Sequence, residues 1–240
     1  MPLILRVDID KPFGLHSMIR RVASKLKEDY WFPDFLNFDY LGHHKEFLRY
    51  CNKNKVVGHM YHRYSTIPDK ETKALTIEGG HHYGFHAENT RSLKTFQDEL
   101  NLFIKLSEGL NVQSFSKHGS GQVKLGKYHY PKYEPENYKK WSKDVKILYP
   151  FGNDPAVTTE DLLVRDGNYF EHAFWLEHRY RSESLNKVED VIEMAKKNDI
   201  VVLIHPCNYK ADTQIRNDFH KLVELAEQNE IKWILLNNPN

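Results

Sequence analysis

Short apolar runs of strand length alternate with amphipathic helical segments along this chain, and this alternation most restricts its fold. Residues 200–204 form the purest buried-strand pattern, and residues 3–8 form a similar run. Apolar residues recur at helical spacing over residues 92–106 and 213–227. Strands that alternate with helices of about 10–15 residues are typical of parallel βαβ units. About seven candidate strands therefore predict an α/β fold, a distorted (β/α) barrel rather than an open sheet.

The remaining candidate elements are shorter or less regular. Further helices are expected at residues 17–27, 44–51, 136–143 and 185–197, and further strands at residues 55–61, 83–85, 112–115, 146–149 and 231–236. The chain has 240 residues, and neither a linker-like stretch nor an internal repeat interrupts it. We therefore expect a single domain over residues 1–240.

Charge and composition exclude several classes of function. The 34 Lys and Arg residues nearly balance the 33 Asp and Glu residues, which leaves no electrostatic footprint for nucleic acid. No apolar run approaches the roughly 20 residues of a membrane span, and no signal-peptide pattern is visible. Cys51 and Cys207 form no spacing motif and indicate reduced thiols. A cytoplasmic protein without a membrane span is the resulting expectation.

Two aspartates, Asp8 and Asp10, follow the first candidate strand. Residues two apart on an extended strand point to the same side, so their carboxylates repel unless a metal, a shared proton or a cation compensates. The functional interpretation makes one a metal ligand and the other a general base. The structural alternative is that Asp8 caps the turn into Lys11 and Pro12 while Asp10 points to solvent.

A histidine-rich segment ends the third candidate strand. On a strand, His82 and His86 share one face with only Gly84 between them, and a small residue there lets the rings and a ligand approach closely. Imidazole nitrogen is a usual ligand of zinc. The pair therefore predicts metal ligands, with ordinary hydrogen-bonded histidines as the alternative.

Three further positions are candidates for chemistry or binding. His205 follows the strand at 200–204 and suits a general acid, unless it serves only the turn before a proline. His118 precedes Gly119 in a Gly-Ser-Gly loop that can approach a substrate, or that is merely a flexible connection. Tyr130 lies in a Lys/Tyr-rich run whose rings suit sugar stacking or phosphate contact, or pack down in a solvated loop.

The order of these motifs resembles that of the NodB-homology polysaccharide deacetylases. The motifs are Asp-x-Asp at residues 8–10, Gly-His-His-Tyr-Gly-Phe-His at 80–86 and Leu-Ile-His-Pro at 203–206. The resemblance implies a distorted (β/α) barrel with about seven strands, a divalent metal such as zinc, and a carbohydrate substrate that loses an N-acetyl group. The most similar branch belongs to bacterial surface-polysaccharide gene clusters, such as capsule or O-antigen.

Carried over by position, the resemblance implies a role for each motif residue. Asp8 becomes the base, Asp10 and His86 become metal ligands, and His205 becomes the acid. The family's second motif histidine falls at position 90, where this chain has Thr90. A zinc site needs about three protein ligands, so a third is expected from another residue. The candidates for this ligand are His82, Glu88 and His118.

The family's arginine motif on a middle strand is matched only loosely, around Lys117. The expected substrate-binding residues are Lys117, His118, Gly119 and Tyr130. Three functions remain open. The first is metal-dependent N-deacetylation of a sugar in surface-polysaccharide biosynthesis. The second, favoured by Thr90, is a catalytically degenerate module that binds a sugar or nucleotide-sugar. The third is a metal-dependent phosphoesterase on a related barrel, which needs more ligands than the motifs supply.

Overall fold

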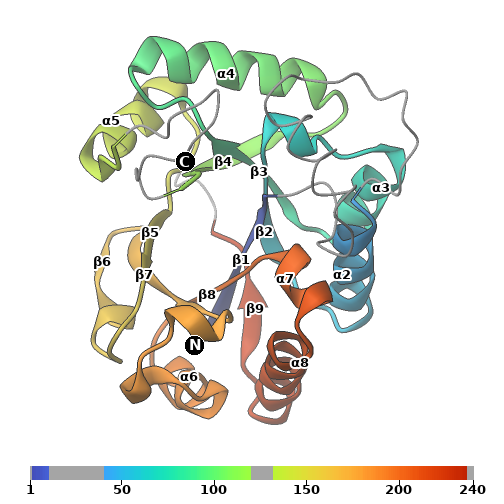
Figure 1. Cartoon of the computed structure of the whole chain (residues 1–240), viewed down its shortest axis with the longest axis vertical. Coiled ribbons are helices and arrows are strands. Elements are labelled where there is room, and N and C mark those ends of the chain that lie inside the picture. Colours follow the sequence, from blue (N-terminus) through green and yellow to red (C-terminus); the bar gives the residue numbers. More distant parts are fainter. Residues whose placement is uncertain (1, 11–40, 120–131, 237–240) are drawn as a thin grey trace.

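The computed structural model describes residues 2–10, 41–119 and 132–236, arranged as Figure 1 shows. The strands are β1 (Pro2–Ile9), β2 (Gly58–His62), β3 (His82–Ala87), β4 (Val112–Lys117), β5 (Phe151–Pro155), β6 (Arg165–Asp166), β7 (Tyr169–Trp175), β8 (Ile200–Ile204) and β9 (Lys232–Ile234). The α-helices are α2 (Gly42–Lys53), α3 (Lys70–Glu78), α4 (Leu93–Leu106), α5 (Pro135–Val145), α6 (Val188–Ala195), α7 (Pro206–Ala211) and α8 (Thr213–Gln228). No helix in these segments is long and apolar enough to cross a membrane.

Seven parallel strands form one curled sheet in the order β4-β3-β2-β1-β8-β7-β5. β9 is also parallel to β1, whereas the short β6 is antiparallel to β7. The two ends of the sheet meet just before β5, where the Phe115 amide donates to the Leu148 carbonyl at 2.8 Å. The sheet therefore curls into the distorted (β/α) barrel that the sequence predicts (Figure 1).

Alternate residues of β1 face opposite sides of the sheet, as strand geometry requires. Leu3, Leu5 and Val7 are buried in the largest hydrophobic cluster, to which α2, α6 and α8 also contribute. A second cluster joins α4 and α5 to the outer side of β3 and β4. Helices thus cover the outer face of the sheet (Figure 1). The even-numbered residues of β1, including Arg6 and Asp8, face the inside.

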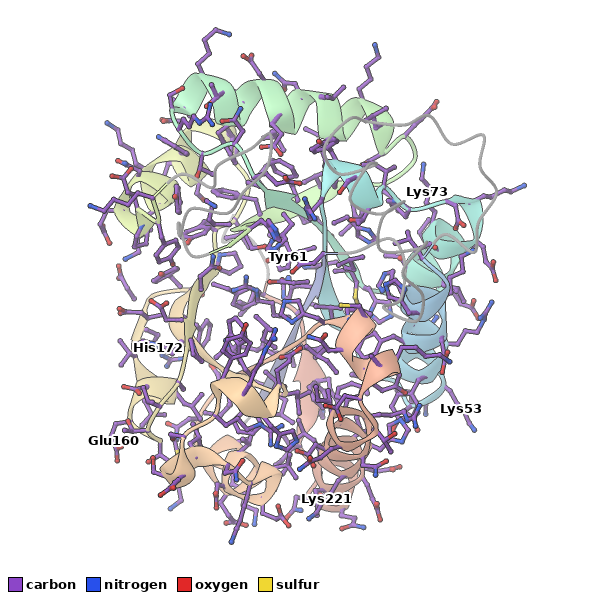
Figure 2. The ribbon with its side chains drawn as sticks, in the orientation of Figure 1. Lys53, Tyr61, Lys73, Glu160, His172 and Lys221 are labelled. Carbon is purple, nitrogen blue, oxygen red and sulfur yellow. The ribbon has the colours of Figure 1, made fainter. Side chains whose placement is uncertain are left out.

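Aromatic and aliphatic side chains fill the interior of the barrel below the strand ends. Tyr61 lies near the centre of the ring of strands, whereas labelled residues such as Lys53 and Lys221 lie at the periphery (Figure 2). Tyr61 is fully buried with Phe151 and Leu203. A Cβ atom at Gly84 would lie 2.5 Å from the Tyr61 ring, so β3 requires glycine at this point. The interior is therefore a packed core that supports the polar strand ends.

Most expected elements are present, with bounds shifted by a few residues. The expected strand at residues 146–149 is wrong, because Lys146 adopts φ 56° where α5 ends and only Leu148 forms an isolated bridge. The strand in this region, β5, begins at Phe151 instead. The sequence patterns also missed α3, β7 and α7. The expected helix at 17–27 lies outside the described residues.

Candidate active site

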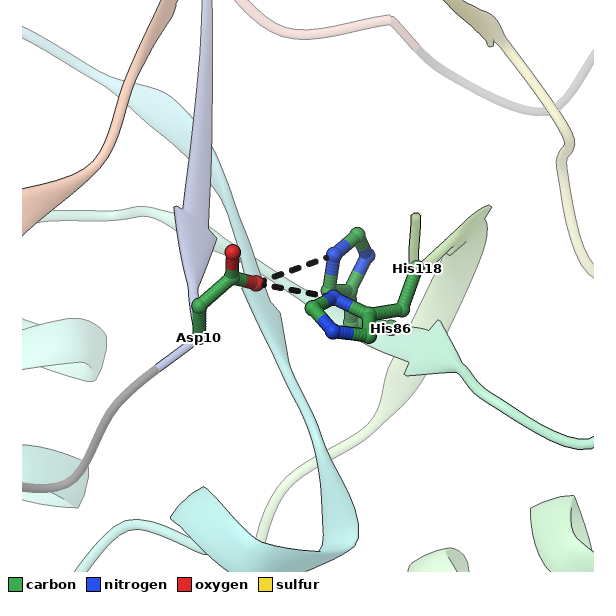
Figure 3. A group of neighbouring side chains, drawn as sticks. All are labelled: Asp10, His86 and His118. Carbon is green, nitrogen blue, oxygen red and sulfur yellow. Dashed lines mark ion pairs between the residues drawn. The ribbon is translucent and has the colours of Figure 1, made fainter. Parts of the chain in front are cut away.

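Three side chains converge where the carboxyl ends of parallel strands meet (Figure 3). Asp10 follows β1, His86 belongs to β3, and His118 follows β4. Because β1, β2, β3 and β4 are neighbours and all parallel, their carboxyl ends lie at one edge of the barrel. Residues far apart in the sequence are thereby brought into one cluster.

The three side chains have the spacing of metal ligands. Oδ1 of Asp10 is 3.2 Å from Nε2 of His86 and 3.0 Å from Nδ1 of His118. One ligand atom from each residue lies within 4.8 Å of the other two. Asp10 Oδ1 is buried, and no contact to it from the described residues meets the usual geometric criteria of a hydrogen bond. One carboxylate and two imidazoles that face a common point fit a divalent ion with an open fourth position.

The surroundings of the two imidazoles prepare them to act as ligands. Nδ1 of His86 lies 2.7 Å from Oγ of Ser116 on β4, and this contact aims Nε2 at Asp10. Metal-binding histidines typically have their second nitrogen fixed in this way. Burial lowers the pKa of His118 to about 4, although Asp10 acts in the opposite direction. His118 is therefore neutral near pH 7, so a nitrogen lone pair can coordinate a metal ion.

Asp8 lies beside this cluster and is paired with Arg6. Its Oδ1 accepts from Arg6 Nε at 3.0 Å and its Oδ2 from Arg6 Nη2 at 2.8 Å. Burial raises the pKa of Asp8, but Arg6 and His86 outweigh burial and hold it below its usual value. Oδ2 of Asp8 is 3.7 Å from Nε2 of His86. An ionised carboxylate thus sits next to the ligand cluster.

His205 lies on the other side of Asp10. Its Nε2 is 3.5 Å from Asp10 Oδ2, and its Nδ1 is 2.8 Å from Oε1 of Glu177. Burial lowers the pKa of His205, but Glu177 and Asp10 overcome this and raise it to about 9. The imidazole is therefore charged near neutral pH and holds a proton on the nitrogen that faces the cluster.

Glu177 is a site residue that the sequence patterns missed. Its carboxylate also accepts hydrogen bonds from the main-chain amide of His205 and from Asn208 Nδ2, both at 3.1 Å. Glu177 follows β7 by two residues, so an acid just past a strand end was the available signal. That signal was lost because β7 itself was not recognised.

Two candidates for the third ligand do not join the cluster. His82 is the first residue of β3, about 13 Å along the strand from His86, and its ring packs edge-on against His59. Glu88 is buried in an ion pair with Arg63, at 2.6 Å. Of the three candidates, only His118 reaches Asp10 and His86.

Thr90 points to a helix rather than to the cluster. Its Oγ1 is 3.2 Å from the hydroxyl of Tyr138 on α5, and the residue is buried. The position that would carry a histidine in the motif pattern is thus part of the packing between β3 and α5. His118, which follows the neighbouring strand β4, lies in the cluster instead.

The other expected substrate-binding residues have mixed placements. The Lys117 side chain is buried and its Nζ donates to the carbonyl of His118, so it contacts the chain itself. Gly119 has φ 72°, a left-handed conformation that suits glycine. Tyr130 lies outside the described residues.

No family model matches the chain, and no curated protein matches it. A solved structure with some similarity is the catalytic domain of peptidoglycan N-acetylglucosamine deacetylase from Eubacterium rectale. The match covers 99% of this chain and 90% of that domain, with 12% sequence identity and a TM-score of 0.47. The likeness is distant.

Proposed function

We propose that this protein is a metal-dependent carbohydrate N-deacetylase, which hydrolyses the amide bond between an acetyl group and a sugar amine. The observation that carries the proposal is the meeting of Asp10, His86 and His118 beside Asp8 and His205. The order of the motifs along the chain, which resembles that of polysaccharide deacetylases, supports the same reaction.

Asp10, His86 and His118 are the proposed ligands, and zinc is the proposed ion. Two imidazoles and one carboxylate form a donor set that zinc uses in hydrolytic sites. When bound, such an ion supplies Lewis-acid polarisation of the acetyl carbonyl and lowers the pKa of water. Ser116 supports this assignment, because it fixes the His86 ring with Nε2 toward Asp10.

Asp8 and His205 are the proposed base and acid. Asp8 takes a proton from the attacking water as the new C–O bond forms, and Arg6 holds its carboxylate in place. His205 then gives the proton on Nε2 to the sugar nitrogen as the C–N bond breaks. Acetate and a free amino sugar are the products. An ionised base and a charged acid on opposite sides of one cluster suit this transfer.

The finer substrate assignment rests on the motif resemblance. We propose a sugar of a bacterial surface polysaccharide, in a capsule or O-antigen, presented as a saccharide or as a nucleotide-sugar. The test therefore measures acetate and primary amine released from N-acetylglucosamine oligomers and from UDP-N-acetylglucosamine, with zinc-loaded protein. We expect release that Asp8→Asn abolishes and His205→Ala strongly reduces.

The kinetic pattern of His205→Ala tests the acid role, because kcat should fall far more than substrate affinity. Asp98→Asn, which changes an exposed carboxylate on α4, is the matched control and should behave as the wild type does. Sugar binding by zinc-loaded protein without acetate release would contradict the proposal and favour a non-catalytic binding module. Release of phosphate from phosphoesters in place of acetate would favour a phosphoesterase.

A further inference from the structure

β4 and β5 are the two edge strands of the sheet. The contacts that link them differ between the start and the carboxyl end of β4. Near the start of β4, main-chain hydrogen bonds connect it to the residues before β5: Phe115 N to Leu148 O, and Leu148 N to Gln113 O. At the carboxyl end of β4, within the described residues, the link is a side chain. Nδ2 of Asn153 on β5 donates to the carbonyl of Lys117 at 2.6 Å and to that of Gly119 at 3.1 Å.

These two carbonyls flank His118, the ligand that comes from β4. The Asn153 amide therefore holds the carbonyl of the residue before His118 and that of the residue after it, while the His118 imidazole points at Asp10. The opposite side of the same segment is held by β3, because His118 N donates to the Ala87 carbonyl at 2.8 Å. His118 is thus clamped between its neighbour strand β3 and the far strand β5.

The other end of the Asn153 side chain reaches the proposed base. Oδ1 of Asn153 accepts from Arg6 Nη2 at 3.0 Å, and the same nitrogen donates to Asp8 Oδ2. Arg6 also donates to the carbonyl of Gly152, the residue before Asn153. One amide side chain thereby connects the backbone around a proposed ligand with the ion pair of the proposed base.

We propose that Asn153 is a positioning residue that sets the place of His118 relative to Asp10 and His86 across the gap between β4 and β5. The inference rests on the proposed function, because it takes these three residues as metal ligands. Asn153 touches neither Asp10 nor His86 in the described contacts, so it acts through the main chain around His118. Residues that orient metal ligands typically change metal affinity by 10- to 100-fold when replaced.

Asn153→Asp tests the inference, because it keeps the shape and the acceptor for Arg6 but removes both hydrogen bonds to the carbonyls. An added negative charge near the ligands would by itself strengthen cation binding, so weaker binding must come from lost positioning. We expect the affinity for Co²⁺ and Zn²⁺, measured by titration of the cobalt absorption and by zinc competition, to fall about 10- to 100-fold. The cobalt spectrum should also change, because the ligand geometry changes.

Asn52→Asp is the matched control. Asn52 on α2 makes the same type of bonds away from the site: its Nδ2 donates to the Leu75 carbonyl at 2.9 Å and its Oδ1 lies 2.8 Å from His81 Nε2. We expect Asn52→Asp to lower the free energy of unfolding while leaving cobalt and zinc affinity at the wild-type value. Equal metal affinity in Asn153→Asp and the wild type, or an equal loss in both variants, would overturn the inference.

Failure of the variant to fold and failure of the wild type to bind metal can both be told apart from a loss of positioning. If Asn153→Asp does not fold, Asn153→Ala, which sets no charge against the carbonyls, is titrated under the same criterion. If the wild-type protein itself binds neither ion, the proposed function fails, and the role of Asn153 toward a metal fails with it. If the wild type binds metal and only the Asn153 variants lose affinity, both stand.

Discussion

Glu177 accepts a hydrogen bond from Nδ1 of His205 at 2.8 Å, and this pairing leaves Nε2 of the same ring 3.5 Å from Asp10. The Glu177 side chain is 2% exposed, so the pair is shielded from water. The carboxylate comes from the end of β7 and the imidazole from the end of β8, which are neighbouring strands. Glu177 therefore fixes both the orientation and the charge of the proposed acid.

Replacing Glu177 by Gln should lower kcat by about 10²-fold with little change in KM, because a general acid contributes about 10²–10⁴-fold to rate and depends on its orientation. Steady-state acetate release measures both constants. Glu171→Gln, an exposed change on the same strand, is the control and should keep the wild-type kcat. A rise in KM with an unchanged kcat would instead assign Glu177 to substrate binding.

The identity of the third ligand can be tested by metal content. His118→Ala should abolish stoichiometric zinc, because only two donors remain, whereas His82→Ala and Thr90→Ala should retain it. Metal analysis after gel filtration gives the ratio. In the wild type, zinc at about 100 times its dissociation constant should raise the free energy of unfolding by about 2.7 kcal/mol, and chelation should remove this gain. Loss of zinc in His82→Ala but not in His118→Ala would contradict the ligand set.

Stability should fall in mild acid partly because of His59. Burial, with a further contribution from His82, lowers the pKa of His59 to about 3, and its Nε2 accepts the amide hydrogen of Leu236. In the unfolded chain His59 takes up a proton near pH 6.5, whereas in the folded chain it stays neutral down to about pH 3. The free energy of unfolding that His59 contributes above pH 6.5 is therefore lost progressively toward pH 3. Between pH 7 and pH 5, the titration of His59 alone should lower the free energy of unfolding by about 2 kcal/mol.

His59→Gln isolates this effect, because glutamine can still accept from Leu236 but does not titrate. Urea unfolding at pH 7 and pH 5 should show a smaller difference between the two pH values for the variant than for the wild type. The His59 ring packs against Tyr61 on β2 and His82 on β3. Both neighbours are present in the variant and in the wild type, so their own titration contributes to the pH dependence of each protein. Identical pH dependence in the two proteins would rule out His59 as the source.

Gly84→Ala should destabilise the protein by about 1–3 kcal/mol, the usual cost of overpacking a core. The added methyl would lie 2.5 Å from the Tyr61 ring and 3.2 Å from the Ser114 carbonyl oxygen. Denaturant unfolding measures the loss. In a Tyr61→Leu background the same change should cost less, because the ring is gone, and an equal cost in both backgrounds would show that the ring is not the obstacle.

The sequence predicted the barrel because its elements carry strong local signals. Residues 200–204 are apolar throughout, and α4 begins where Ser92 accepts a hydrogen bond from the Thr95 amide. β7 was not predicted because its burial does not follow a simple alternation: Tyr169 and Phe170 are both buried, as are Ala173 and Phe174. α7 is short and begins with a proline directly after His205, which reads as a turn.

The candidate site could be predicted only as far as strand ends are visible in sequence. Asp10, His86 and His205 could be selected as candidates because each lies at or just after the end of a predicted strand. Glu177 was missed because the strand before it, β7, was not recognised, and Asn153 was missed because nothing local indicates that it would bridge two strands. Such contacts depend on how far the sheet curls, which is a property of the whole fold.

The layer of Tyr61, Phe151 and Leu203 beneath the site makes the barrel a bowl rather than a tunnel. Under the proposed function, a long saccharide cannot pass through the barrel and has to bring its N-acetyl group to Asp10 from the end at which β1 and β3 finish. Under that function, substrate and products use the same end of the barrel, so an acetate released beneath the sugar can leave only with the sugar or after it.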